Sequence, residues 1–186
     1  MGWTAQTASD GYTYNIYLQD KENSCACASI VMAARLAKNK ILDESTVRGW
    51  VQQAEGSVNT NAQGVRSFDD TGTAGDLLSS VFQKIQITSF TVKGTSNVGK
   101  WIVNTRRSHP AVVGVIWKSF NAGTGMWDSV GGHMVLAVNV HNNNVIFLDP
   151  GIGVVEIPIT NLPVYAVTYA GSASVSQGYM EQMTTA

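Results

Sequence analysis

The sequence predicts an α+β fold, with helices in the first half of the chain and an antiparallel sheet in the second. Before Pro110, apolar residues recur at helical spacing. After Pro110, short β-branched runs alternate with Gly, Asn and Pro turn signals. No internal repeat and no low-complexity linker divides the 186 residues, so we expect one domain over residues 1–186. Segregated helices and antiparallel strands form two layers, with a cleft between them.

Four helices are expected in a helical lobe at about residues 19–108. Each is bounded by residues that cap or break helices. The first is the strongest, because its apolar spacing continues without Gly or Pro. The expected helices are Cys25 to Asn39, the segment after Asp43 and Ser45 that ends at Gly56, the segment from Thr73 through GDLLSSVFQKI, and Val98 to Arg107.

Five strands are expected in a sheet lobe at about residues 109–170. They are the runs AVVGVIW, HMVLAVNV, VIFLDP, GVVEIPI and VYAVTYA. HNNN between the second and third predicts a hairpin turn, since Asn tolerates left-handed backbone geometry. NAGTGMWDSVGG is expected to be a long loop beside the cleft, a common place for substrate selection. We expect flexible ends: an extended arm over residues 1–18 and a mobile tail from Gly171.

Charge and hydropathy exclude two classes of partner. The formal net charge is −1, from 12 basic and 13 acidic residues, and no block of like charge is present. We therefore expect no nucleic acid partner. No apolar stretch reaches the roughly 18 residues that a membrane span needs, so no membrane partner is expected either. The start, MGWTAQTASDGY, lacks the basic and apolar segments of a signal peptide.

Both cysteines, Cys25 and Cys27, stand at the start of the first predicted helix. Their side chains point roughly 200° apart on a helix, so a disulfide between them would be strained. Cys-x-Cys also lacks the spacing of a zinc site and has no second pair, so neither a metal nor a cofactor is expected. At the first helical turn, unpaired N–H groups and the helix dipole stabilise a thiolate. Cys25 is therefore a candidate nucleophile, the alternative being a small apolar core residue.

His133 and Asp149 supply the other groups that thiol catalysis needs. His133 stands in GGHMVLAV at the entry of one predicted strand, and Asp149 stands in VIFLDPG at the end of the next. If these strands pair antiparallel, the two positions are neighbours and the carboxylate can reach the ring. A thiolate then attacks a carbonyl, the imidazolium protonates the leaving amine, and the carboxylate orients the ring.

Gln19 is the candidate oxyanion donor. It precedes Cys25 by six residues, on the loop that leads into the first helix. Its side-chain amide and the backbone N–H of Cys25 together form a two-donor oxyanion hole, and each such donor contributes about 3 kcal/mol in other acyl-transfer enzymes.

Other cysteine, histidine, aspartate and tryptophan residues are weaker candidates for these roles. Cys27 is the alternative nucleophile, but it is expected to face the core, and it lies eight residues from Gln19. His141 shares a strand face with His133, yet it adjoins the turn and is expected to be solvated. The remaining expectations are His109 as a surface cap, Asp69 and Asp70 as solvated carboxylates, and Trp117 and Trp127 as walls of a substrate groove or as packing residues.

Three segments, QDKENSCACASI, GGHMVLAVNV and FLDPG, resemble the Gln, Cys, His and Asp motifs of papain-like (clan CA) cysteine peptidases. The likeness covers roughly residues 19–151. It is greatest to bacteriocin-leader processing peptidases and to AvrRpt2-type secreted effectors of plant-associated bacteria. It implies a two-lobe fold with the active site in the cleft. It also implies Gln19 as oxyanion donor, Cys25 as nucleophile, His133 as base and Asp149 as the residue that orients it.

The sequence departs from the family pattern at two places. Ala26 follows the nucleophile, where the family often has glycine, and Asp149 stands where papain has asparagine. Processing peptidases of the bacteriocin class normally precede a membrane transporter, which this chain lacks. The resemblance therefore favours a free-standing secreted enzyme.

The resemblance implies a cysteine endopeptidase that acts through a thioester intermediate, as a secreted bacterial effector or toxin. Its implied partners are a polypeptide substrate from a host or target cell and an inhibitor or immunity protein. Two alternatives stay open. One is a glutamine deamidase or transglutaminase-like acyl-transfer toxin, which uses the same Cys, His and Asp roles. The other is a non-catalytic binding module with the papain fold.

Overall fold

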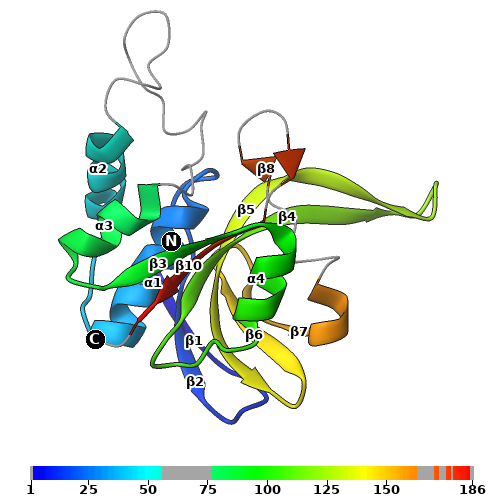
Figure 1. Cartoon of the computed structure of the whole chain (residues 1–186), viewed down its shortest axis with the longest axis horizontal. Coiled ribbons are helices and arrows are strands. Elements are labelled where there is room, and N and C mark those ends of the chain that lie inside the picture. The colour runs from blue at the N-terminus through cyan, green and yellow to red at the C-terminus, as the bar shows by residue number, and fades with distance from the viewer. Residues whose placement is uncertain (1, 56–76, 163–169, 172–174, 177, 185–186) are drawn as a thin grey trace, which may run out of the picture.

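The computed structural model describes residues 2–55, 77–162, 170–171, 175–176 and 178–184 (Figure 1). It has the α+β architecture that the sequence predicts. A six-stranded antiparallel sheet with strand order β3-β10-β4-β5-β6-β7 is packed against helices. Among the described helices, none is long and apolar enough to cross a membrane.

The helices follow the prediction, with different ends. They are α1 (Cys25–Lys38), α2 (Glu44–Glu55), α3 (Leu78–Lys84) and α4 (Thr95–Ile102). Asn39 ends α1 in a left-handed conformation, and its N–H donates to the carbonyl of Arg35. The expected end of the fourth helix at Arg107 is wrong, because the chain turns after Ile102 and forms a bridge between Arg106 and His109. The expected start of the third helix at Thr73 lies outside the described residues.

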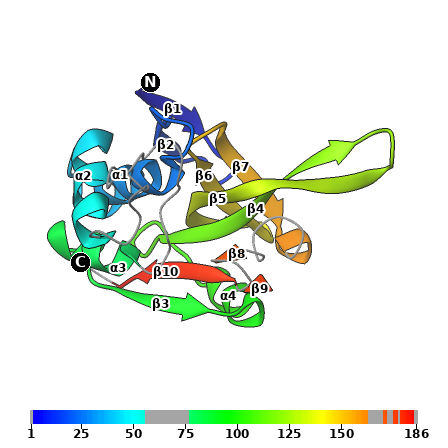
Figure 2. The ribbon, with the colours of Figure 1, turned by 90° about the horizontal axis from the view of Figure 1, so that it is seen from above.

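Side chains alternate across the sheet and form two cores. On β5 and β6, even-numbered residues such as Leu136 and Leu148 pack with α1, α2 and α3, whereas odd-numbered ones such as Val135 and Phe147 pack with α4. The helices therefore cover both faces (Figure 2). The sheet strands are β3 (Ser89–Lys93), β4 (Ala111–Asn121), β5 (Met126–His141), β6 (Asn144–Asp149), β7 (Gly153–Pro158) and β10 (Tyr179–Met183); the short β8 (Ala170–Gly171) and β9 (Val175–Ser176) pair with each other.

The turn predicted at HNNN is confirmed. Asn142 and Asn143 connect β5 to β6, with φ values of 47° and 61°. The long loop expected over NAGTGMWDSVGG is wrong, since β4 and β5 pair as far as Asn121 and Met126. Figures 1 and 2 show this hairpin projecting from the body of the protein.

The mobile tail expected from Gly171 is wrong for residues 179–183. These residues form β10, which is buried between β3 and β4. Its Glu181 carboxylate is buried and accepts hydrogen bonds from the hydroxyls of Ser89, Thr91 and Tyr179. These bonds compensate for the lost hydration of the charge, which is why a polar segment can lie inside a sheet.

The predicted N-terminal arm is a hairpin, β1 (Trp3–Thr7) and β2 (Thr13–Tyr17), docked on the sheet. Gln6 Oε1 accepts a hydrogen bond of 2.7 Å from the N–H of Val154. The carboxylate of Glu156 accepts hydrogen bonds from the N–H (2.7 Å) and the hydroxyl (2.5 Å) of Ser9. The hairpin leads directly into Gln19 and the loop before α1.

Gly153→Ala is expected to lower the free energy of unfolding by about 3 kcal/mol. Gly153 has φ +103°, and an added Cβ would displace the end of the Gln6 side chain, which then loses its hydrogen bond from the N–H of Val154. Gly11→Ala is the matched control, because Gly11 has φ +75° but nothing near its Cβ position; a cost of about 1 kcal/mol is expected there. Urea unfolding measures both values. Equal costs for the two variants would contradict the docking contact.

Candidate active site

Cys25 is the first residue of α1, where the backbone N–H groups of the first turn lack helical partners. The first ten residues of the helix are buried, and Cys25 itself is 9% exposed. No side chain caps this helix end. The N–H groups and the positive end of the helix dipole can therefore act on the sulfur or on a bound anion.

Ser29 docks the Cys25 end of α1 onto β5. Its hydroxyl donates a hydrogen bond of 3.1 Å to the carbonyl of Met134, the residue after His133. Residues four apart lie on the same side of a helix, so Cys25 lies one turn before Ser29 on this side. The docking thus brings the thiol near the His133 ring, close enough for Cys25 to contribute to the raised pKa of the ring.

His133 and Asp149 make the contact that their spacing predicts. Leu136 pairs with Leu148, which sets Asp149 opposite Val135, on the same sheet face as His133. The distance from His133 Nε2 to Asp149 Oδ1 is 2.9 Å, and the carboxylate is fully buried. The same oxygen also accepts a hydrogen bond of 2.7 Å from the N–H of Gly151, so the acid is fixed from two sides.

The environment of His133 favours the protonated ring. Burial acts to lower the pKa of His133, but hydrogen bonds with Asp149 and Cys25, and the charges of both groups, outweigh it and raise the pKa to about 9. Because Asp149 occupies Nε2, the nitrogen left for Cys25 is Nδ1. An imidazolium at this position stabilises a neighbouring thiolate and can later protonate a leaving group.

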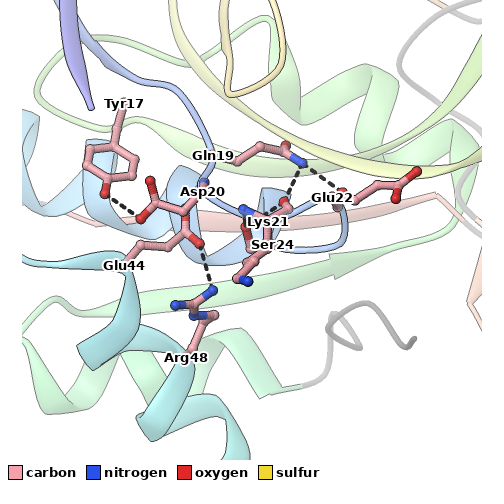
Figure 3. Close-up of polar contacts among 8 residues, drawn as sticks. All are labelled: Tyr17, Gln19, Asp20, Lys21, Glu22, Ser24, Glu44 and Arg48. Carbon is pink, nitrogen blue, oxygen red and sulfur yellow. Dashed lines mark hydrogen bonds and ion pairs between the residues drawn. The ribbon is translucent and has the colours of Figure 1, made fainter. Parts of the chain in front are cut away.

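Gln19 stands on the loop before Cys25, but its amide faces the loop itself (Figure 3). Nε2 donates to the carbonyls of Lys21 (2.8 Å) and Glu22 (2.7 Å), while Oε1 is buried without a hydrogen-bond partner. The backbone N–H of Gln19 donates to the carbonyl of Pro150, next to Asp149. The loop is thus tied to the strand end that holds the acid. To bond an oxyanion, the Gln19 amide must release one of the two carbonyls.

Glu44 is a buried carboxylate near this loop that the sequence did not suggest as part of the site. It is the first residue of α2 and is fully buried. Its Oε2 accepts a hydrogen bond of 2.8 Å from the N–H of Asp20, the residue after Gln19. Acidic residues at helix starts usually face solvent, so this burial could not be predicted from the sequence.

The other candidates lie apart from these residues or outside the described part of the chain. Cys27 is fully buried in the core, and His141 lies at the β5–β6 turn beside Asn142. Among the described residues, no group of His, Cys, Asp and Glu side chains could hold a metal ion. His109 lies in the turn after α4 and contacts Ser108. The structure does not describe four other candidates: residues Asp69 and Asp70, and the side chains of Trp117 and Trp127.

The folded protein is expected to lose stability as the pH rises from about 6.5 to about 9. The pKa of His133 is raised from 6.5 to about 9 on folding, so its contribution is complete below 6.5 and is lost as the folded ring deprotonates. The loss is on the order of 3 kcal/mol, at about 1.4 kcal/mol per pKa unit. Urea unfolding over this range measures it. His133→Gln should flatten the dependence, whereas His141→Gln should keep it; a flat wild-type curve would contradict the ion pair.

No protein-family model and no curated relative matches the chain. Solved structures do match it. The peptidase domain of Streptococcus ComA, a bi-functional ABC transporter, aligns with a TM-score of 0.56 at 15% identity, over 90% of this chain and 97% of that one. A double glycine motif protease from an AMS/PCAT transporter aligns with 0.54 at 12% identity, over 99% and 96%. A C39-like peptidase from Bacillus anthracis aligns with 0.50 at 14% identity, over 88% and 92%.

These matches cover nearly the whole length of each chain. The protein therefore has the fold of the papain-like cysteine peptidases of the C39 type, in agreement with the resemblance of its sequence motifs.

Proposed function

We propose that the protein is a cysteine endopeptidase that cleaves polypeptides through a thioester intermediate at Cys25. The observation that carries the proposal is the buried Cys25–His133–Asp149 arrangement at the mouth of α1. Three groups of the right types meet there, and the ring pKa of about 9 favours an imidazolium at neutral pH. The fold shared with peptidases supports the same reaction class.

The reaction proceeds in two steps at these residues. The Cys25 sulfur attacks the scissile carbonyl carbon, and the carbonyl oxygen becomes an oxyanion that the N–H groups at the helix start stabilise. His133 passes its proton to the leaving amine, the C–N bond breaks, and a thioester remains. Neutral His133 then takes a proton from water, which hydrolyses the thioester and frees the thiol. Asp149 keeps Nε2 engaged and Nδ1 directed at the sulfur throughout.

The proposed substrate is a polypeptide. The neighbour from the AMS/PCAT transporter was solved with a leader peptide bound. We extend peptide binding to this chain because the fold is shared over nearly the whole length of both chains. A host or target-cell protein as substrate, and an inhibitor or immunity protein as a second partner, are part of the proposal.

The test compares the protein with its own alkylated form. The only other thiol, Cys27, is fully buried, so iodoacetamide at about pH 6 should modify Cys25 alone. Both forms are desalted and incubated with a bacterial lysate and with a eukaryotic lysate, and new peptide N-termini are identified by mass spectrometry. New N-termini are expected only with the unmodified protein. Identical profiles for the two forms would refute the proposal.

Mass measurement separates hydrolysis from the alternative acyl transfers. A gain of about one mass unit at glutamine, without new N-termini, would mark a deamidase, and crosslinked products would mark a transglutaminase. Slow, equal alkylation of both cysteines would mark a binding module without chemistry.

The proposal includes action outside the producing cell, as the resemblance to secreted effectors implies. The chain should then accumulate in the medium of bacteria that express it from its own locus. Immunodetection in cells and medium, with a cytoplasmic marker protein to exclude lysis, tests this. Retention in the cell fraction would count against the effector role and leave the peptidase chemistry intact.

A further inference from the structure

A cluster of polar side chains behind the Gln19 loop has no role in the reaction described above. It comprises Tyr17, Asp20, Ser24, Glu44 and Arg48 (Figure 3). The Tyr17 hydroxyl donates to the Asp20 carboxylate at 2.9 Å, and the Asp20 N–H donates to Glu44 at 2.8 Å. The cluster thus joins β2, the loop and the start of α2.

Glu44 lies where it can act on the start of this loop. Asp20, whose N–H donates to Glu44 Oε2, follows the oxyanion candidate Gln19. The other carboxylate oxygen, Oε1, is buried without a hydrogen-bond partner. Ser24, which precedes the nucleophile Cys25 and is also fully buried, bonds the N–H and the carbonyl of Lys21 and so closes the loop on itself. One carboxylate therefore holds the chain directly after Gln19, and the closed loop carries this constraint to the residue before Cys25.

The Glu44 carboxylate is an unfavourable choice for stability alone. Burial raises the pKa of Glu44, and so does the charge of Asp20; the hydrogen bond from the Asp20 N–H and the Arg48 guanidinium at 3.5 Å lower it only in part. A neutral side chain of the same shape would avoid this desolvation. A charge kept at this position against its solvation cost is typical of a functional constraint.

We propose that Glu44 is a positioning residue of the peptidase reaction: its ionised carboxylate fixes the loop between Gln19 and Cys25 and thereby the oxyanion donors. The inference rests on the proposed function. Protonation of Glu44 weakens its acceptor for the Asp20 N–H, so the loop loosens while the Cys25–His133 pair stays in place. The groups facing the carboxyl are Asp20, Arg48 and Ser24, with Tyr17 acting through Asp20.

Glu44→Gln is the main variant, since it keeps the shape and removes the charge. We expect kcat on the fastest peptide from the lysate screen to fall about tenfold, with KM unchanged within about twofold, because oxyanion stabilisation acts in the transition state. Alkylation of Cys25 by iodoacetamide forms no oxyanion, so its rate should stay within about twofold. Asp43→Asn, the same charge change at the exposed neighbouring residue, should leave both rates unchanged.

The pH dependence of hydrolysis, compared with that of alkylation, distinguishes a positioning role of Glu44 from a purely structural role. When the wild type is acidified, kcat for hydrolysis should begin to fall at a higher pH than the rate of Cys25 alkylation. The reason is that only hydrolysis needs ionised Glu44. In Glu44→Gln the two acid limbs should coincide. A kcat at the wild-type level, or a parallel fall of hydrolysis, alkylation and melting temperature, would overturn the inference.

Hydrogen exchange tests the loop independently of any activity. The Asp20 N–H should exchange at least tenfold faster in Glu44→Ala than in the wild type, and the Asp43→Asn control should match the wild type. Wild-type exchange in Glu44→Ala would overturn the inference. If no peptide is cleaved at all, the proposed function fails, whereas the exchange result still decides whether Glu44 holds the loop.

Discussion

Cys25→Ala is expected to lower kcat/KM for peptide hydrolysis on the order of 10⁵-fold, because no other group in the site can form the thioester. In other covalent hydrolases the loss of the nucleophile removes nearly all of the chemical acceleration and leaves only what binding and the oxyanion hole supply. The assay uses the fastest peptide from the lysate screen under single-turnover conditions. The variant should fold, because alanine is smaller than cysteine and has a high helix propensity.

Cys27→Ala is the matched control for this prediction. The two thiols are separated by one residue, but Cys27 is fully buried in the core. Its loss should cost about 1 kcal/mol of stability through a small cavity and leave kcat/KM within about twofold. The reverse pattern, with Cys27→Ala inactive and Cys25→Ala active, would reassign the nucleophile. Equal activity in both variants would remove thiol catalysis altogether.

Local patterns in the sequence predicted the features that depend on near neighbours. The spacing of apolar residues predicted α1, and the tolerance of Asn142 and Asn143 for positive φ predicted the turn from β5 to β6. Once that turn is fixed, antiparallel pairing brings Asp149 near His133, which is why their proximity could be expected. The sequence does not indicate the register shift between Ala137 and Asn139, which sets Asp149 opposite Val135 and so on the same sheet face as His133.

Long-range pairing could not be predicted in the same way. The segment YMEQM carries two polar residues and looks like a solvated tail, yet it is the β10 strand between β3 and β4. Hydroxyls from β3 compensate for its buried Glu181, and those residues lie about ninety positions away in the chain. The burial of Glu44 likewise depends on how α2 meets the loop. No periodic pattern in the sequence indicates such contacts between distant segments.

In the proposed reaction His133 has two roles, so its removal separates two kinds of reactivity at one sulfur. As an imidazolium it stabilises the thiolate, and as a proton donor it releases the leaving amine. Alkylation requires only the first role, whereas peptide hydrolysis requires both. The raised pKa of about 9, caused by Asp149 and Cys25 against the effect of burial, predicts that the ring is charged at pH 6.

His133→Ala is therefore expected to lower kcat/KM for hydrolysis by about 10⁴-fold or more and the alkylation rate of Cys25 at pH 6 by about 100-fold. The smaller second effect follows because an unassisted thiol still ionises slightly at this pH, and the start of α1 still favours the thiolate. His141→Ala, on the same strand, should change neither rate. Alkylation of His133→Ala at the wild-type rate would show that the sulfur is activated by the helix alone, and the ion pair would then have no part in catalysis.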